Sequence, residues 1–196
     1  MDIEGPGSKL CARLALLGEH QAENAVTAVA CIEALRDHGA FVPDEAIPDG
    51  LISVRWPGRL EVLRHVPLVV ADGAHNRDSA RRLREALAGP LAAERVTFIV
   101  GSSADKDVAG LAEELAPLAE RVIAVRADHP RAMEAADVAE AFQRLDIPTE
   151  VVDNVGAALG QALAEAGSSG VICLTGSLFV AAEAREHLGL GKKERI

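Results

Sequence analysis

The chain has 196 residues, of which 49% are hydrophobic and 26% are charged, and 30 acidic residues against 20 Lys and Arg give a net charge of −10. This negative balance disfavours proteins that bind the nucleic-acid backbone or anionic membranes, because both rely on dense Lys and Arg. No stretch approaches the roughly 20 apolar residues of a membrane span, and no signal-peptide core follows the first residues. We therefore expect a cytoplasmic globular protein without a nucleic-acid or membrane partner.

The first 50 residues differ in character from the rest of the chain. Residues 12–17 read as a lone short strand, residues 21–36 as an Ala-rich helix with Gln21 and Asn24 on a polar strip, and residues 41–50 as a Pro-rich connector. A helix that is apolar almost all round needs a partner layer. The segment either packs back on the main domain or, as we favour, is the tail of a preceding domain plus a linker.

Residues 51–196 are expected to form a separate domain, in which short apolar runs alternate with helical patterns. The expected strands cover residues 68–71, 96–100, 122–125, 149–152 and 171–174. Such an alternation indicates a parallel sheet covered by helices on both faces. A further strand at residues 60–63 is joined to the next by a turn too short for a parallel crossover. We therefore predict a Rossmann-like three-layer α/β sandwich, with a mostly parallel sheet of about six strands and one antiparallel edge strand.

Ligands of open α/β sheets bind at the carboxyl ends of the strands, and the first of two unusual strings lies at such an end. Residues 72–76 (Asp-Gly-Ala-His-Asn) follow the strand at 68–71 and bring two ionisable groups and an amide together. The alternative is a plain turn, with Asn76 as the helix cap. Residues 56–59 (Trp-Pro-Gly-Arg) would present Arg59 from a Pro-Gly turn, either to phosphate oxygens or simply to solvent.

Two further strings follow later strands. Residues 105–107 (Asp-Lys-Asp) place Lys106 where it can bind a phosphate or a carboxylate, although a charged loop capped by Asp107 explains the string equally well. Residues 175–177 (Thr-Gly-Ser) join hydroxyl groups to the free N–H groups of a helix start, which suits an anion, but a simple Ser cap is an equal alternative.

Several signatures of catalytic and cofactor sites are missing from the sequence. It holds no G-x-x-x-x-G-K-S/T phosphate loop, no G-x-G-x-x-G after an expected strand and no G-x-S-x-G serine elbow. The six histidines show no spacing typical of zinc, so we predict no metal site. Cys11, Cys31 and Cys173 are scattered and odd in number, and we interpret them as small buried apolar residues.

The order of these strings along the chain is more specific than any one of them. They cover residues 18–25 (Gly-Glu-His-Gln-Ala-Glu-Asn-Ala), 56–61 (Trp-Pro-Gly-Arg-Leu-Glu), 72–76, 105–107 and 175–178 (Thr-Gly-Ser-Leu). In this order they resemble the folylpolyglutamate synthase/dihydrofolate synthase family, a branch of the Mur ligase superfamily. The resemblance extends from about Gly18 to Leu188 and corresponds to the C-terminal domain of that family.

The resemblance implies a reaction in which MgATP phosphorylates a folate or dihydropteroate carboxylate and the amine of L-glutamate attacks the acyl phosphate. It implies that Asn24, Arg59 and Asp72 contact ATP. It further implies that the nucleotide lies between this domain and a P-loop domain that carries the Mg²⁺ ligands. Such chemistry depends on cationic groups that stabilise the negative charge of the transferred phosphoryl group more than on a protein nucleophile.

For the amino-acid substrate, the resemblance implies that His75 and Ser177 lie near the incoming glutamate, with Lys106 close by. No complete catalytic set is expected in this chain, in which Lys106 and His75 would have supporting roles. The family usually has Pro after residues 72–76, whereas Arg77 stands here, which affects local rigidity only. Because the P-loop is missing, we expect a truncated piece of a longer ligase that is inactive alone.

Two other functions remain open from the sequence. The chain is alternatively a free-standing α/β module that binds a nucleotide or an acidic metabolite without catalysis, or a purely structural domain. The sequence also leaves open whether the parent enzyme makes dihydrofolate, extends polyglutamate tails or does both. An apolar flank on residues 21–36 would favour self-association.

Overall fold

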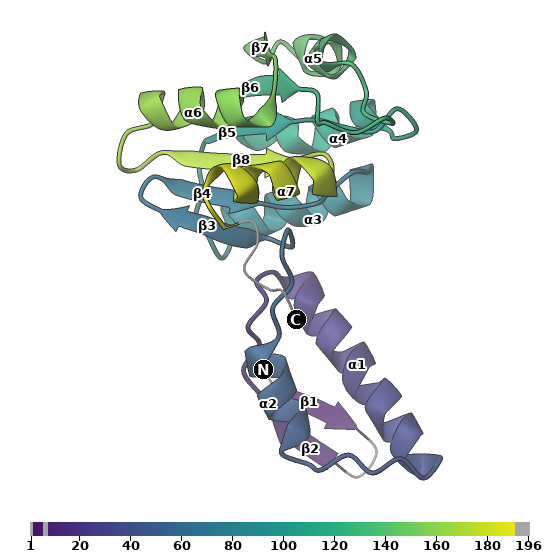
Figure 1. The fold of residues 1–196 in the computed structure, drawn as a ribbon. Helices are drawn as coiled ribbons and strands as arrows, with labels where there is room; N and C mark the ends of the chain where they lie inside the picture. Colours follow the sequence, from purple (N-terminus) through teal and green to yellow (C-terminus); the bar gives the residue numbers. More distant parts are fainter. Residues whose placement is uncertain (1, 6–7, 191–196) are drawn as a thin grey trace. The chain divides into compact units, whose positions relative to one another are not determined.

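The computed structural model describes residues 2–5 and 8–190, with side chains from residue 11 onward, and the chain forms two compact units (Figure 1). The units are Met1–Pro57 and Gly58–Ile196. The sequence led us to expect the division between residues 50 and 51. In the structure, the Trp-Pro half of the Trp-Pro-Gly-Arg string belongs to the first unit and the Gly-Arg half to the second.

The first unit contains a hairpin and two helices. The hairpin is formed by β1 (Asp2–Gly5) and β2 (Ser8–Cys11), which pair in antiparallel register, and the helices are α1 (Glu19–Asp37) and α2 (Ala46–Ser53). The expectation of a lone strand at residues 12–17 is therefore wrong, since the only strands described here precede it. The connector expected at residues 41–50 is also partly wrong, because α2 begins inside it. Pro48 lies in the first turn of α2, where a missing N–H costs no helical hydrogen bond.

Helix α1 buries one narrow stripe of its surface. Gln21, Ala25 and Val29 are spaced four residues apart and are buried, and Val29 forms a small apolar cluster with Ile47 of α2. The buried Gln21 amide is satisfied by Asn24, whose Nδ2 donates to its Oε1 at 3.0 Å. The expected polar strip is thus divided, because Gln21 is buried whereas Asn24 is exposed like most of the remainder of α1.

The second unit is built on a six-stranded sheet that confirms the predicted fold class. The strands are β3 (Glu61–His65), β4 (Leu68–Ala71), β5 (Val96–Val100), β6 (Ala119–Val125), β7 (Thr149–Val152) and β8 (Val171–Thr175). Their spatial order is β3-β4-β8-β5-β6-β7. All neighbours are parallel except β3 and β4, which form the predicted antiparallel pair at one edge.

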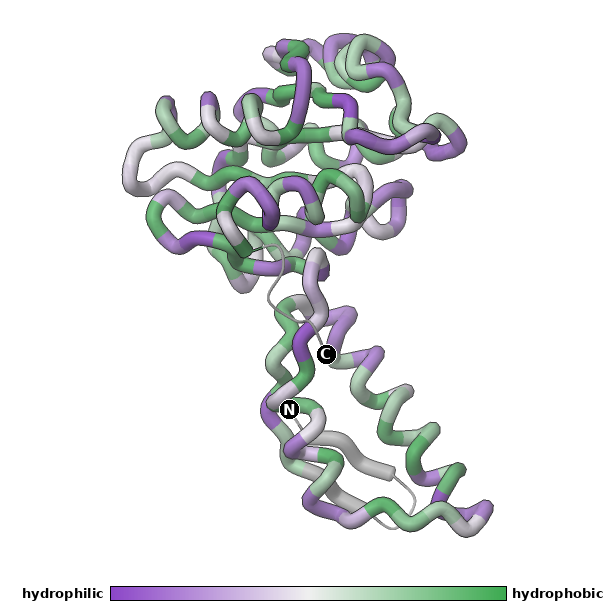
Figure 2. The backbone as a smooth tube through the Cα atoms, viewed as in Figure 1, coloured by the Kyte–Doolittle hydropathy of each residue, from purple (hydrophilic) through white to green (hydrophobic). Residues whose placement is uncertain are grey.

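Helices cover both faces of this sheet, and the alternation of side chains along each strand explains why (Figure 1). The helices are α3 (Arg77–Ala88), α4 (Val108–Leu115), α5 (Ala135–Gln143), α6 (Val155–Glu165) and α7 (Leu178–His187), with a 3₁₀ turn at Ala116–Leu118. Val70 and Phe98 pack with α3, α4 and α5 on one face, whereas Val69 and Ile99 pack with α6 and α7 on the other. Figure 2 shows hydrophobic residues concentrated along the central strands.

The structure corrects the interpretation of two cysteines. Cys173 is fully buried in β8, as expected, but Cys11 and Cys31 are exposed. Within the residues that the structure describes, no helix has both the length and the apolar character that a membrane crossing requires.

Candidate active site

Three loops meet at the carboxyl edge of the sheet, because β4, β8 and β5 are adjacent parallel strands. Backbone hydrogen bonds join the loops: Asp72 N donates to Leu174 O at 3.0 Å, Gly176 N to Ala74 O at 2.9 Å, and Gly101 N to Thr175 O at 3.2 Å. The strands β4 and β5 lead into helices on one face of the sheet, and β8 leads into a helix on the other. Such a reversal is where α/β sheets open a ligand crevice.

Two glycines allow the loops to approach this closely. At Gly176, where φ is 95°, a Cβ atom would stand 2.5 Å from the carbonyl oxygen of Gly101. At Gly73, a Cβ atom would stand 2.5 Å from a methyl group of Leu178. No side chain larger than hydrogen therefore fits at either position without a displacement, and Gly176 also has a backbone conformation that favours glycine.

Asp72 is buried at this edge, and its carboxylate accepts hydrogen bonds from two backbone segments. Its Oδ2 accepts a hydrogen bond from Leu60 N at 2.7 Å, and its Oδ1 accepts one from Ala74 N at 2.8 Å. A third bond, from Gly73 N to Gly58 O at 2.8 Å, completes the link. The carboxylate thereby holds the turn at residues 58–60, which exposes Arg59, against the loop that follows β4. The side chain that the sequence placed at a strand tip is 8% exposed.

The buried carboxylate also affects the thiol beneath it. The pKa of Cys173 is raised well above its ordinary value of 9.0, chiefly by burial and secondly by the negative charge of Asp72. Cys173 therefore remains a neutral, inert thiol in the folded protein.

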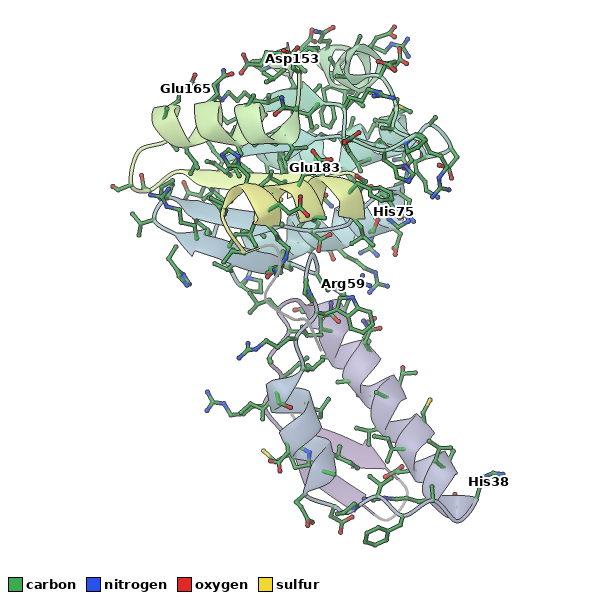
Figure 3. All side chains as sticks on the ribbon, in the orientation of Figure 1. His38, Arg59, His75, Asp153, Glu165 and Glu183 are labelled. Carbon is green, nitrogen blue, oxygen red and sulfur yellow. The ribbon has the colours of Figure 1, made fainter. Side chains whose placement is uncertain are left out.

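His75 lies exposed in the loop between β4 and α3 (Figure 3). Its Nδ1 is 2.9 Å from the carbonyl oxygen of Gly73. Since a carbonyl only accepts, Nδ1 carries the proton in this bond, and Nε2 of the neutral ring has a lone pair to offer. Asn76 caps α3 by accepting from Ser79 N at 2.9 Å, so the predicted cap is confirmed.

Ser177 and Lys106 occupy the other two loops. Ser177 is 7% exposed, and its Oγ accepts from Val180 N at 3.2 Å, which makes it the N-cap of α7. Lys106 Nζ lies 3.0 Å from Asp105, and this ammonium group lowers the pKa of the Asp105 carboxyl by a hydrogen bond. Asp107 caps α4 by accepting from Gly110 N at 2.8 Å. Asp107 and Ser177 thus have the capping roles that the sequence offered as alternatives to ligand binding.

A fourth loop, which the sequence analysis did not single out, joins this edge. Residues 126–134 follow β6, and their backbone pairs with the loop after β5 through hydrogen bonds from Met133 N to Ser102 O at 2.8 Å and from Ala104 N to Arg131 O at 2.9 Å. Only the folded order of the strands brings this loop to the others. The string Asp-His-Pro-Arg at residues 128–131 is the local sequence signal that could have indicated a functional loop here.

The remaining predicted residue, Asn24, belongs to the first unit, where it is exposed on α1. Among the described residues, no group of three or more His, Cys, Asp or Glu side chains is arranged to hold a metal ion. A cavity of about 920 Å³ lies at the opposite, amino edge of the sheet. Arg121 lines it and pairs there with Glu165 at 2.5 Å, so the cavity is separate from the four loops.

Comparisons with known proteins agree with this geometry. Residues 58–178 match the family described as "Mur ligase, glutamate ligase domain". A probable bifunctional folylpolyglutamate synthase/dihydropteroate synthase of Halobacterium salinarum is 37% identical over 186 residues, which are 94% of this chain and 22% of the relative. The crystal structure of Mycobacterium tuberculosis folylpolyglutamate synthase complexed with ADP and AMPPCP superimposes with a TM-score of 0.81 at 29% identity.

The structural match covers 98% of this chain and 48% of the M. tuberculosis enzyme. A bifunctional folylpolyglutamate synthase/dihydrofolate synthase of Yersinia pestis, complexed with AMPPNP and Mn, matches 95% of this chain and 43% of its own length, with a TM-score of 0.82 and 28% identity. The chain thus spans less than half the length of each of these relatives. It belongs to the Mur ligase family, as a glutamate ligase domain whose relatives are folylpolyglutamate synthases.

Proposed function

We propose that this chain is the glutamate-binding, C-terminal part of an ATP-dependent folate–L-glutamate ligase. The observation that carries the proposal is the match of residues 58–178 to the glutamate ligase domain, together with the four loops gathered at one edge of the sheet. In the reaction, ATP phosphorylates a folate carboxylate, the glutamate amine attacks the acyl phosphate, and an amide forms as phosphate leaves.

Arg59 binds the phosphate groups of ATP in this proposal. Its guanidinium is exposed on the turn that Asp72 and Gly58 fix to the sheet edge. A fixed guanidinium stabilises phosphate charge without having to be reorganised during the reaction. Asp72 therefore contributes mainly by holding the turn, in addition to the ATP contact that the family resemblance implies. For Asn24, the nucleotide contact is proposed on the family resemblance alone.

His75, Ser177 and Lys106 face the amino-acid substrate in this proposal. The free Nε2 of His75 can accept a hydrogen bond from the glutamate amine and orient its lone pair toward the acyl phosphate. Ser177 stands at the N-terminus of α7, where N–H groups favour an anion such as a carboxylate. Lys106 adds a positive charge from the neighbouring loop. These groups bind and orient, and the phosphoryl transfer itself depends on the partner domain.

The partner we propose is a P-loop-bearing portion of the ligase, which would hold the Mg²⁺ and most of the folate. A chain with no phosphate loop of its own supplies one wall of such a site. The competing function, a module that binds nucleotide without catalysis, predicts ATP binding by the chain but no ligation in any setting.

The test is a chimera in which this chain replaces the matching part of the M. tuberculosis enzyme. We expect ATP-dependent attachment of glutamate to a reduced folate, reduced at least tenfold by Arg59→Ala and unchanged by Arg144→Ala, which removes an exposed arginine paired with Glu140 on α5. The parent enzyme is the positive control. A chimera that is folded by circular dichroism and inactive would contradict the proposed function.

A further inference from the structure

The turn that exposes Arg59 is held on both sides of that residue. Gly58 and Leu60, its two neighbours, are buried, whereas Arg59 itself is exposed. On one side, Leu60 N donates to Asp72 Oδ2 at 2.7 Å. On the other, Gly58 N donates to Glu61 Oε2 at 2.9 Å. Two carboxylates therefore fix the backbone of the turn, one from the loop after β4 and one from the start of β3.

The backbone of this turn needs outside support. Gly58 has a φ of 70° and Leu60 a φ of 42°, both in the left-handed region. This region suits glycine but is unfavourable for leucine, and a non-glycine residue remains there only where the surrounding contacts hold it. A Cβ atom at Gly58 would stand 3.4 Å from side-chain atoms of Leu178 and Ala181, so the turn also packs against α7. The direction in which Arg59 leaves the turn thus depends on the groups that hold its neighbours.

Glu61 is itself held by α7. Its Oε1 pairs with the guanidinium of Arg185, while its Oε2 accepts from Gly58 N, so each carboxylate oxygen has its own partner. The side chains of Arg185 and Glu61 are 22% and 25% exposed, which shields the pair partly from solvent. Arg185 Nη2 also donates to Leu190 O at 3.0 Å. A chain of contacts therefore runs from the end of α7 through Glu61 to the residue that precedes Arg59.

We infer that Glu61 and Arg185 are positioning residues, which direct the Arg59 guanidinium toward the phosphate groups of ATP by fixing Gly58 N. The inference rests on the proposed function. A carboxylate accepts a stronger hydrogen bond from a backbone N–H than a neutral group does. Its negative charge would repel a nearby triphosphate, and the pairing with Arg185 offsets that charge. Arg185 thus fixes the orientation of Glu61 and also makes a carboxylate tolerable beside a nucleotide.

The first experiment measures amide hydrogen exchange at Gly58 by NMR in this chain, without nucleotide. We expect Glu61→Ala to raise the exchange rate about 10- to 100-fold, since a charge-assisted hydrogen bond is lost, and Glu61→Gln to raise it less, because an amide oxygen still accepts. Glu140→Ala is the matched control, which removes an exposed carboxylate paired with Arg144, and should change the rate less than twofold. An unchanged rate in Glu61→Ala overturns the inference.

The second experiment measures the ATP affinity of the chimera by calorimetric titration, as a double-mutant cycle. We expect Glu61→Ala to weaken ATP binding about tenfold when Arg59 is present and less than twofold in the Arg59→Ala background, because Glu61 acts through Arg59. Arg185→Ala should behave in the same way, and Arg185→Lys should restore part of the affinity. Circular dichroism checks folding, and Glu61→Gln replaces Glu61→Ala if the latter does not fold. Equal losses in both backgrounds would indicate a general structural role and overturn the inference.

Ligase activity of the same chimera is measured separately, so that the two hypotheses can fail independently. ATP affinity that depends on Glu61 only when Arg59 is present, in a chimera without ligase activity, upholds the positioning role and contradicts the proposed function. An active chimera whose ATP affinity does not change on Glu61→Ala overturns the positioning role and leaves the proposed function intact. ATP affinity that does not depend on Arg59, or no ATP binding at all, also overturns the positioning role.

Discussion

Replacing Asp72 by alanine should destabilise the second unit strongly, and the structure sets the magnitude. The substitution removes both acceptors at 2.7 and 2.8 Å and leaves the N–H groups of Leu60 and Ala74 in a site where the residue is 8% exposed. Each buried donor left unsatisfied costs about 1–3 kcal/mol, so the expected loss is about 3–5 kcal/mol. That is a large part of the 5–15 kcal/mol typical of a domain. Asp72→Asn retains one acceptor oxygen and should lose roughly half as much.

The measurement is equilibrium unfolding in urea, followed by far-UV circular dichroism of the whole chain. Trp56 fluorescence serves as a separate reporter for the first unit, to which that residue belongs. Asp153→Ala is the control, because Asp153 is exposed, and it should change the free energy of unfolding by less than about 0.5 kcal/mol (Figure 3). A loss below about 1 kcal/mol for Asp72→Ala, with an unchanged m-value, would refute the role of Asp72 in holding the turn.

Two further predictions concern the same edge and its helices. Since the pKa of Cys173 is raised by burial, the folded state keeps this proton above pH 9 while the unfolded state loses it, so the protein should lose stability as the pH rises through and above about 9. Unfolding titrations at pH 8 and pH 10.5 should therefore show this decline reduced in Cys173→Ala, and an equal decline in both proteins would contradict it. Gly176→Ala should lower the free energy of unfolding by about 2–4 kcal/mol, because of the positive φ at this position and the contact of the added Cβ with Gly101 O. Gly160→Ala should raise it by about 0.5–1 kcal/mol, because Gly160 lies within α6 and nothing lies within 4 Å of the added Cβ. Thermal denaturation of the two glycine variants measures both effects, and Tm shifts of the same sign would contradict the prediction.

Much of the second unit could be predicted from the sequence, because its strands are continuous apolar runs separated by clear turns. The stripe of Ala80, Leu83 and Leu87 on α3, for example, is buried as the 3.6-residue period requires. The first unit was predicted less well. Strands β1 and β2 have four residues each and depend on pairing with each other. Helix α2 has a proline near its start, which a local interpretation takes as a sign of irregular structure.

The sequence indicated the strings that gather at the candidate site, but not the contacts that hold them together. Asp72 looked like a side chain offered to a ligand, and nothing local indicates that its carboxylate accepts from Leu60, twelve residues earlier. Arg185 had no assigned role, because its pairing with Glu61 depends on α7 lying beside the turn at residues 58–60. Contacts between residues distant in sequence are set by strand order, and the sequence pattern predicted the strands without their order.

The place of β8 also has a consequence for how the protein is made. This strand is the last of the sheet to be synthesised, yet it lies between β4 and β5, which make no hydrogen bonds to each other. Until Val171–Thr175 is available, both earlier strands expose unpaired backbone groups in the middle of the future sheet, where a foreign strand could dock. The sheet is therefore completed only when β8 pairs with strands that are distant in sequence, and contacts of long sequence separation slow folding. A nascent chain of this protein should need protection from aggregation until its final strand has emerged from the ribosome.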